Sequence, residues 1–408
     1  MRRWLSPSNL VATSIIVAVA AMVVVANIRD VRQSRASYTR PDVIGTRGAK
    51  TTRDDLNRRI DDLRRRLSRQ PEDLGLAVML ADALMRQTRV TGNAGLAIEA
   101  EQSVKRALDG DAANYDGSRM LAAIYLSQHR FREAIAVAEK NRAARPYDPV
   151  NYGVIGDGHL ELGEYDEAFD AFDRMMTLRP SAAAYARVAY ARELQGNLAG
   201  AVEAMELAAG ATAADDLEAL AWHQSQLGDL YLRMGKVREA ESAYRAASHA
   251  FPGHPFAVVG YSRVLAARGD TSGALTLLQE LARTAPTPDL AARIGDLLKR
   301  LGRADEAERQ FAIAEAGWRS DAPEPKNLAR FLADHDRGID EAVAIAERAA
   351  AERRDIFTED ALAWSYFKAG RVEDARRAIA RAMRTGTTDA DILAHARAIG
   401  QPVQAARR

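Results

Sequence analysis

Residues that could perform chemistry are few in this sequence, and they do not fall into catalytic spacings. The seven histidines are scattered, and none belongs to an H-E-x-x-H zinc motif. The run Asp334–Asp336, followed by Asp340, has the residue types that bind a metal ion. Its order does not match a calcium-binding EF-hand loop, and acidic residues at this position also cap a helix. We therefore predict no metal site and no cofactor.

Nucleophilic and phosphate-binding chemistry is equally poorly supported. The sequence Gly260-Tyr261-Ser262 lacks the second glycine of a nucleophile elbow. Gly156, Gly158 and Gly163 lie on a predicted helix rather than after a strand, which argues against a phosphate cradle. The chain has no cysteine, so thiolate catalysis and cysteine-based metal sites are excluded. The sequence therefore predicts a protein that is not an enzyme.

Composition narrows the class of protein further. The 57 basic and 56 acidic residues give a net charge of +1, whereas nucleic-acid-binding proteins usually carry a basic stripe. Hydrophobic residues make up 47% and charged residues 28%, which is typical of a folded protein. Aromatic residues are only 6%, which favours helices over sheets. We expect an all-α protein that binds no nucleic acid.

Residues 1–27 differ from the rest of the chain. Leu10–Ala26 contains no charged residue and is just long enough for a helix to span a membrane. An uncleaved transmembrane anchor, a removable signal peptide and a buried helix are the alternatives. The favoured reading is a single-pass anchor with the rest of the chain outside the cytoplasm. In the alternative, cleavage leaves a secreted or periplasmic protein.

Two segments connect this region to the rest of the chain. Residues 28–52 are rich in arginine and contain Pro41 and glycines, so they form either a flexible linker or a contact with anionic lipids. Residues 53–70 carry apolar residues three and four apart, which predicts an amphipathic helix. This helix either caps the following domain or mediates self-association. The oligomeric state is left unassigned.

Alanines recur at a nearly constant interval through the remaining sequence. They are separated by 33 to 35 residues, except for one interval of 39. Periods of this size are typical of stacked repeats. The alanines are Ala100, Ala134, Ala168, Ala201, Ala240, Ala274, Ala307, Ala342 and Ala375.

The pattern within each period predicts two helices separated by a glycine-containing break. Small residues on each helix would let the two backbones approach closely, as Gly228 and Ala240 illustrate. Glycine costs about 1 kcal/mol in a helix interior, so its presence there calls for such a packing reason. The structural residues predicted on this basis are Gly156, Ala168, Gly228, Ala240, Ala274, Gly295, Ala307 and Ala375.

The sequence resembles the tetratricopeptide repeat (TPR) family, whose pattern is W-x2-L-G-x2-Y, A-x3-F and P. Residues 227–252 match it with Leu227, Gly228, Tyr231, Ala240, Tyr244 and Pro252. The resemblance implies a right-handed superhelical solenoid of about nine TPR-like helix pairs over residues 71–385, after the one transmembrane helix. Residues 386–400 are expected to form a capping helix and 401–408 a tail. Extra residues near Thr88–Asn93 and Ala209–Asp216 predict long loops, which either carry contacts or tolerate insertions.

The resemblance also implies that first helices line a groove that binds a partner protein or peptide. Trp222 and Phe256 are residues that often dominate binding, but they could equally pack between repeats. The groove residues predicted from the family spacing are Arg119, Asp157, Tyr190, Trp222, Asp229, Phe256, Arg263 and Asp296.

These observations lead to one functional hypothesis and one alternative. The chain is predicted to be a membrane-tethered protein–protein interaction scaffold, which contributes to the assembly of an envelope complex. The alternative is a substrate-recruiting accessory subunit of an enzyme or a secretion system.

Overall fold

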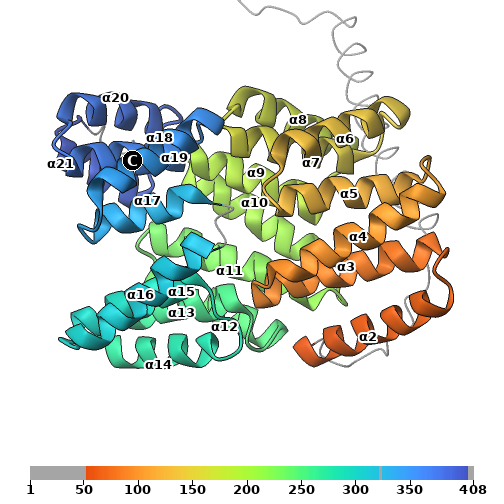
Figure 1. Ribbon diagram of the computed structural model, residues 1–408, viewed down its shortest axis with the longest axis horizontal. Coiled ribbons are helices and arrows are strands. Elements are labelled where there is room, and N and C mark those ends of the chain that lie inside the picture. Colours follow the sequence, from red (N-terminus) through yellow and green to blue (C-terminus); the bar gives the residue numbers. More distant parts are fainter. Residues whose placement is uncertain (1–51, 321–323, 403–408) are drawn as a thin grey trace, which may run out of the picture. The chain divides into compact units, whose positions relative to one another are not determined.

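The computed structural model describes residues 52–320 and 324–402, and every regular element among them is an α-helix (Figure 1). The predicted anchor (1–27) and nearly all of the predicted linker (28–52) lie outside these residues. None of the helices described combines the length and the apolar character needed to cross a bilayer.

The helices are α2 (Arg53–Arg69), α3 (Leu74–Thr91), α4 (Ala94–Gly110), α5 (Tyr115–Ser127), α6 (Phe131–Ala144), α7 (Pro149–Leu162), α8 (Tyr165–Leu178), α9 (Ala182–Leu194), α10 (Leu198–Ala211), α11 (Leu217–Arg233), α12 (Val237–Ala250), α13 (Pro255–Ala267), α14 (Thr271–Ala282), α15 (Pro288–Arg300), α16 (Ala304–Ser320), α17 (Pro325–Asp334), α18 (Ile339–Glu352), α19 (Ile356–Lys368), α20 (Val372–Ala382) and α21 (Ala390–Ile399).

Consecutive helices pack as hairpins, from α3/α4 to α19/α20, and the hairpins stack in chain order. Each of the nine recurring alanines lies on the second helix of a pair, and all are between 0 and 2% exposed. The amphipathic helix α2 packs on α3 at one end, and α21 packs on α19 and α20 at the other. Both ends of the stack are thus covered, as a solenoid requires to hide its terminal apolar surfaces.

The tightest point of a helix pair is a glycine that faces an aromatic ring. A Cβ atom built on Gly228 of α11 would lie 2.5 Å from the ring of Tyr244 on α12, and one on Gly260 of α13 would lie 2.0 Å from the same ring. Tyr244 is 0% exposed, so its ring cannot simply move into solvent. The same arrangement recurs at Gly156 with Phe172 and at Gly295 with Phe311. In both cases a Cβ atom built on the glycine would lie 2.4 Å from the ring.

The prediction of long loops at the two irregular repeats is wrong. The residues near Thr88–Asn93 extend α3 as far as Thr91, and Gly92 ends the helix. At the second site α10 continues to Ala211 and α11 begins at Leu217. Extra residues are absorbed into longer helices because a helix satisfies its own backbone hydrogen bonds, whereas a loop of equal length leaves them to solvent.

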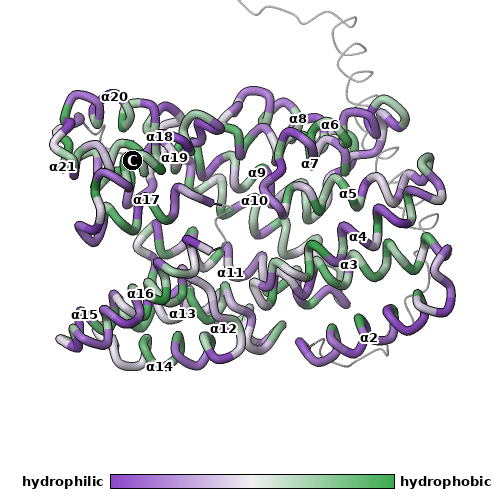
Figure 2. Tube along the Cα trace, in the orientation of Figure 1, coloured by the Kyte–Doolittle hydropathy of each residue, from purple (hydrophilic) through white to green (hydrophobic). Residues whose placement is uncertain are grey.

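Hydropathy follows this packing. Figure 2 shows α2 as mostly hydrophilic, interrupted by apolar positions. Its apolar residues Leu56, Ile60 and Leu63 are buried, while its arginines and aspartates form the exposed face. This division explains how a helix of such low mean hydropathy remains attached to the stack.

The stack winds far enough for distant repeats to touch. The backbone N–H of Ile356, the first residue of α19, donates a hydrogen bond of 2.9 Å to the hydroxyl oxygen of Tyr165 at the start of α8, 191 residues earlier. The N–H of Arg354 donates to the carbonyl of Leu162 at 3.1 Å. We call this line of contacts the seam: it joins the turns inside early helix pairs to the connections between later pairs.

The glycine–aromatic contact predicts the effect of adding one methyl group. Gly228→Ala should destabilise the protein by roughly 1–3 kcal/mol, because the Cβ overlaps the buried Tyr244 ring. Gly210→Ala is the matched control, since Gly210 is also helical but has no neighbour within 4 Å. Urea denaturation should show a lower midpoint for the first variant only. Equal midpoints for the two variants would contradict the packing argument.

Candidate protein-binding surface

All eight predicted groove residues lie on first helices of the pairs. Neighbouring first helices contact one another directly from α3 to α9, between α11 and α13, and between α17 and α19, so their side chains can form continuous stretches of surface there. The placements are Arg119 on α5, Asp157 on α7, Tyr190 on α9, Trp222 and Asp229 on α11, Phe256 and Arg263 on α13, and Asp296 on α15.

Charged residues of this surface pair from one repeat to the next. The Asp157 carboxylate accepts two hydrogen bonds from Arg187 of α9, at 2.9 and 2.6 Å. Asp229 pairs with Arg263 of α13 at 2.5 Å. These ion pairs are partly exposed, so each adds only about 0–1 kcal/mol to stability. Their main effect is to fix the position of charged groups along the first helices.

Asp229 also connects the surface to the tight helix crossing. The Tyr244 hydroxyl donates a 2.6 Å hydrogen bond to the Asp229 carboxylate. Burial raises the pKa of Tyr244, and the negative charge of Asp229 raises it further. Tyr244 therefore stays neutral and keeps donating, so the ring that fills the crossing also holds a carboxylate of the surface.

The run Asp334–Asp336 serves packing and a turn. The His335 ring lies 4.2 Å from the Phe311 ring, and its Nε2 is 3.8 Å from the carboxylate of Asp296. Burial lowers the pKa of His335 and raises that of Asp296. Within residues 52–320 and 324–402, no three His, Asp or Glu side chains are grouped to hold a metal ion.

The aromatic residues of the surface differ in exposure. Phe256 is 43% exposed and its ring lies 5.8 Å from that of His254. Trp222 is half-buried and packs against the apolar cluster of α9 to α12. Tyr190 packs against the large apolar cluster of the C-terminal repeats. Phe256 is therefore the predicted aromatic residue with the most surface available to a partner.

Two groups of polar residues were missed from the sequence. Arg187 could have been found, because it lies 30 residues after Asp157 and carries the opposite charge. Residues of the seam gave no such signal. Arg89 of α3 donates to both carboxylate oxygens of Glu218 on α11, at 3.0 and 2.6 Å, across 129 residues.

Glu218 is the most deeply buried member of this seam contact, at 2% exposure. Burial by itself would raise the pKa of its carboxyl. The imidazole of His254, 3.8 Å away, and the two hydrogen bonds from Arg89 outweigh this effect and lower the pKa to about 2. The folded state therefore holds Glu218 ionised, and its stability depends on that charge.

Comparison with known proteins gives the class of the fold. A family model described as tetratricopeptide repeat matches residues 225–288, and a PPR repeat model matches residues 150–179. A search of curated proteins finds no match. The repeated helix pairs, together with these local matches, define a helical-repeat protein.

Solved structures extend the similarity over most of the chain. The APC/C hetero-tetramer Cut9-Hcn1 gives a TM-score of 0.54 at 15% identity, over 86% of this chain and 60% of the matched one. Human IFIT1 in complex with PPP-AAAA gives 0.52 at 14% identity, over 80% and 77%. This chain thus spans 60% of the first relative's length. At these identities the likeness concerns the fold alone: the chain is a TPR-like repeat protein.

The pKa of Glu218 predicts a pH dependence of stability. Because that pKa is lower when folded than the usual value near 4.3, ionised Glu218 stabilises the protein above about pH 4. This contribution, on the order of 3 kcal/mol, should be lost as the pH falls from about 4 to 2. Glu218→Gln should remove this contribution at neutral pH. In a series of urea denaturations, its free energy of unfolding should therefore fall less steeply than that of the wild type between about pH 4 and pH 2.

Glu203→Gln is the control, since Glu203 is 76% exposed and lies 4.0 Å from its nearest cation. It should follow the wild-type curve throughout. If the free energy of unfolding falls equally at low pH in Glu218→Gln and in the wild type, the Arg89–Glu218 contact does not stabilise the fold.

Proposed function

We propose that this protein is an interaction scaffold, which binds a partner protein or peptide along the surface formed by its first helices. The observation that carries the proposal is the placement of the eight predicted residues on first helices, where the Asp157–Arg187 and Asp229–Arg263 pairs each join two neighbouring first helices. Breaking such partly exposed ion pairs costs little free energy, so their charged groups can pair with charges of an extended partner instead.

Phe256 is the residue on which we expect binding to depend most. It is an exposed large hydrophobic side chain on the same helix as Arg263. Aromatic and arginine side chains dominate binding energy when a partner buries them. Trp222 and Tyr190 contribute to the shape of the binding surface, because much of each ring is already packed against neighbouring repeats.

The proposal includes attachment to a membrane and participation in the assembly of an envelope complex. Its support is in the sequence: Leu10–Ala26 carries no charge and is followed by an arginine-rich segment. A scaffold held at the bilayer keeps its partner at high local concentration there.

Binding to protein is favoured over binding to nucleic acid. Human IFIT1 was solved with PPP-AAAA and with m7Gppp-AAAA. In this chain 57 basic residues are balanced by 56 acidic ones, and the arginines of the first-helix surface are paired with aspartates. Phosphate binding needs an excess of positive charge, so we retain a protein or peptide as the partner.

Crosslinking of the tagged full-length protein in its own cells tests the binding proposal. Mass spectrometry should identify a partner whose crosslinks map to first helices, and Phe256→Ala should reduce its capture at least tenfold. Tyr147→Ala is the control, because Tyr147 is 78% exposed but lies in the connection between α6 and α7. Equal capture by both variants, or crosslinks confined to second helices, would refute the assignment of the surface.

Membrane attachment is tested separately. The full-length protein should remain with the membrane pellet after alkaline extraction, because an inserted apolar helix is held by hydrocarbon rather than by charge. Val17→Arg places a charge in the middle of Leu10–Ala26 and should release a large fraction of the protein into the supernatant. Arg47→Ala, outside the apolar run, should not. Release of the unaltered protein would count against the anchor.

A further inference from the structure

The seam is built from a row of turns, one inside each of the early helix pairs. In this row Gly92, His129, Gly163 and Gly196 all have positive φ angles, between 60° and 80°. L-residues other than glycine are strained in this region of conformational space. Gly163 and Gly196 stand beside the α18–α19 and α20–α21 connections, close to 190 residues further along the chain.

The glycine turns of this row touch the later repeats directly. A Cβ on Gly163 would lie 2.4 Å from the backbone oxygen of Arg354, and a Cβ on Gly196 would lie 2.5 Å from that of Gly386. At Gly92 the nearest atom is the Thr287 methyl group, at 2.9 Å. At Gly163 and Gly196 the nearest atom belongs to the backbone, which leaves no room for a side chain, whereas at Gly92 the Thr287 methyl group would have to move. By contrast, turns of later pairs are open, with no neighbour within 4 Å at Gly235, Gly269, Gly302 or Gly370.

His129 is the exception in the row. It adopts φ 60° without being glycine, a property it shares only with Asp336 among the described residues. Backbone hydrogen bonds fix this turn, among them the one that the Arg130 N–H donates to the Tyr125 carbonyl at 2.9 Å, and contacts of the His129 side chain add to them. The imidazole Nδ1 lies 2.6 Å from the carboxylate of Glu324, which precedes α17, and the ring packs edge-on against Phe131 at 5.5 Å.

The Glu324 carboxylate is held from several sides. Lys326 lies 3.1 Å from it, and the guanidinium of Arg353 also pairs with it. Arg353 is 8% exposed and faces the Phe131 ring at 5.4 Å. Burial opposes ionisation of Glu324, but the imidazole and the two cations hold its pKa far below the usual range. Glu324 is therefore an ionised group to which His129 can attach.

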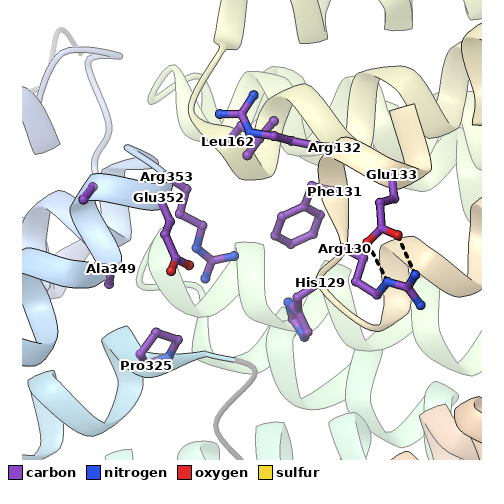
Figure 3. A pocket seen from close by; sticks show the side chains of 11 residues that line it. His129, Arg130, Phe131, Arg132, Glu133, Leu162, Pro325, Ala349, Glu352 and Arg353 are labelled. Carbon is purple, nitrogen blue, oxygen red and sulfur yellow. Dashed lines mark hydrogen bonds and ion pairs between the residues drawn. The ribbon is translucent and has the colours of Figure 1, made fainter. Parts of the chain in front are cut away.

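A cavity opens in the seam at this place. It has a volume of about 410 Å³ and lies between the α5–α6 turn on one side and the start of α17 and end of α18 on the other. Figure 3 shows Phe131 and Arg353 facing each other across it, with His129 beside them. At Gly163 and Gly196 the turns meet the backbone of later repeats, whereas at His129 the seam is joined by side chains.

We propose that His129 acts as a latch, whose contact with Glu324 holds two successive windings of the superhelix together at the point where their backbones do not meet. Removing the latch separates the α5–α6 turn from Glu324 and the start of α17, and loosens the adjoining contacts at Leu162 and Tyr165. The inference concerns the conformation of the free protein and does not depend on the identity of any partner.

Spin labels across the cavity test the latch, and the chain has no cysteine of its own to interfere. The labels are placed at Arg132→Cys and Glu352→Cys, which line opposite sides of the cavity and are both exposed. In the full-length protein electron–electron distance measurement should give one narrow distribution. His129→Gly should broaden it and shift it to longer distances, and Glu324→Gln should do the same. Glycine occupies the neighbouring turns of the row, so the first variant is expected to fold.

Asp336→Gly is the matched control, since it relieves the same backbone strain but its side chain pairs with Lys368 of α19, away from the cavity. It should leave the distribution unchanged.

Hydrogen exchange gives a second readout. The amides of Arg354 and Ile356, which donate across the seam, should exchange at least tenfold faster in His129→Gly and at the wild-type rate in Asp336→Gly. A narrow, unshifted distance together with unchanged exchange in His129→Gly would overturn the proposal.

Discussion

The close contact between a glycine on one helix and an aromatic ring on the next is the constraint on which the architecture depends. Gly228 against Tyr244 is the clearest case, because the ring is completely buried and also meets Gly260 of the following pair. One ring thereby sets the distance within a pair and the distance to the next pair. Because each crossing sets how one pair packs on the next, an error at one crossing would be passed along the stack.

The surface proposed for binding follows from these crossings. Tyr244 fills the crossing with its ring and holds Asp229 with its hydroxyl, and Asp229 in turn pairs with Arg263 of the next first helix. Packing inside the stack and charge placement on its surface are thus linked through single side chains. This linkage gives a protein with few reactive groups a defined surface of alternating charge.

Glycine has a different role at the seam. Gly163 and Gly196 permit positive φ angles and also leave space for the backbone of repeats about 190 residues later. His129 occupies the equivalent turn with a side chain, and a cavity lies there. The seam therefore combines backbone contacts at Gly163 and Gly196 with side-chain contacts such as His129–Glu324 and Arg89–Glu218. His129 differs from the glycines in the equivalent turns, and this difference in sequence marks the first of these side-chain contacts.

The sequence by itself determined the local unit: the interval of the alanines predicted the helix pairs, and small residues such as Gly228 predicted where they cross, because both depend on contacts within about 35 residues. It failed at Thr88–Asn93, where a predicted loop is helix, since spacing alone does not show whether added residues continue a helix. Only the tertiary structure decided the seam, including Arg89–Glu218 and His129–Glu324. Such contacts depend on the small rotation between neighbouring pairs summed over several repeats, and no single repeat encodes that sum.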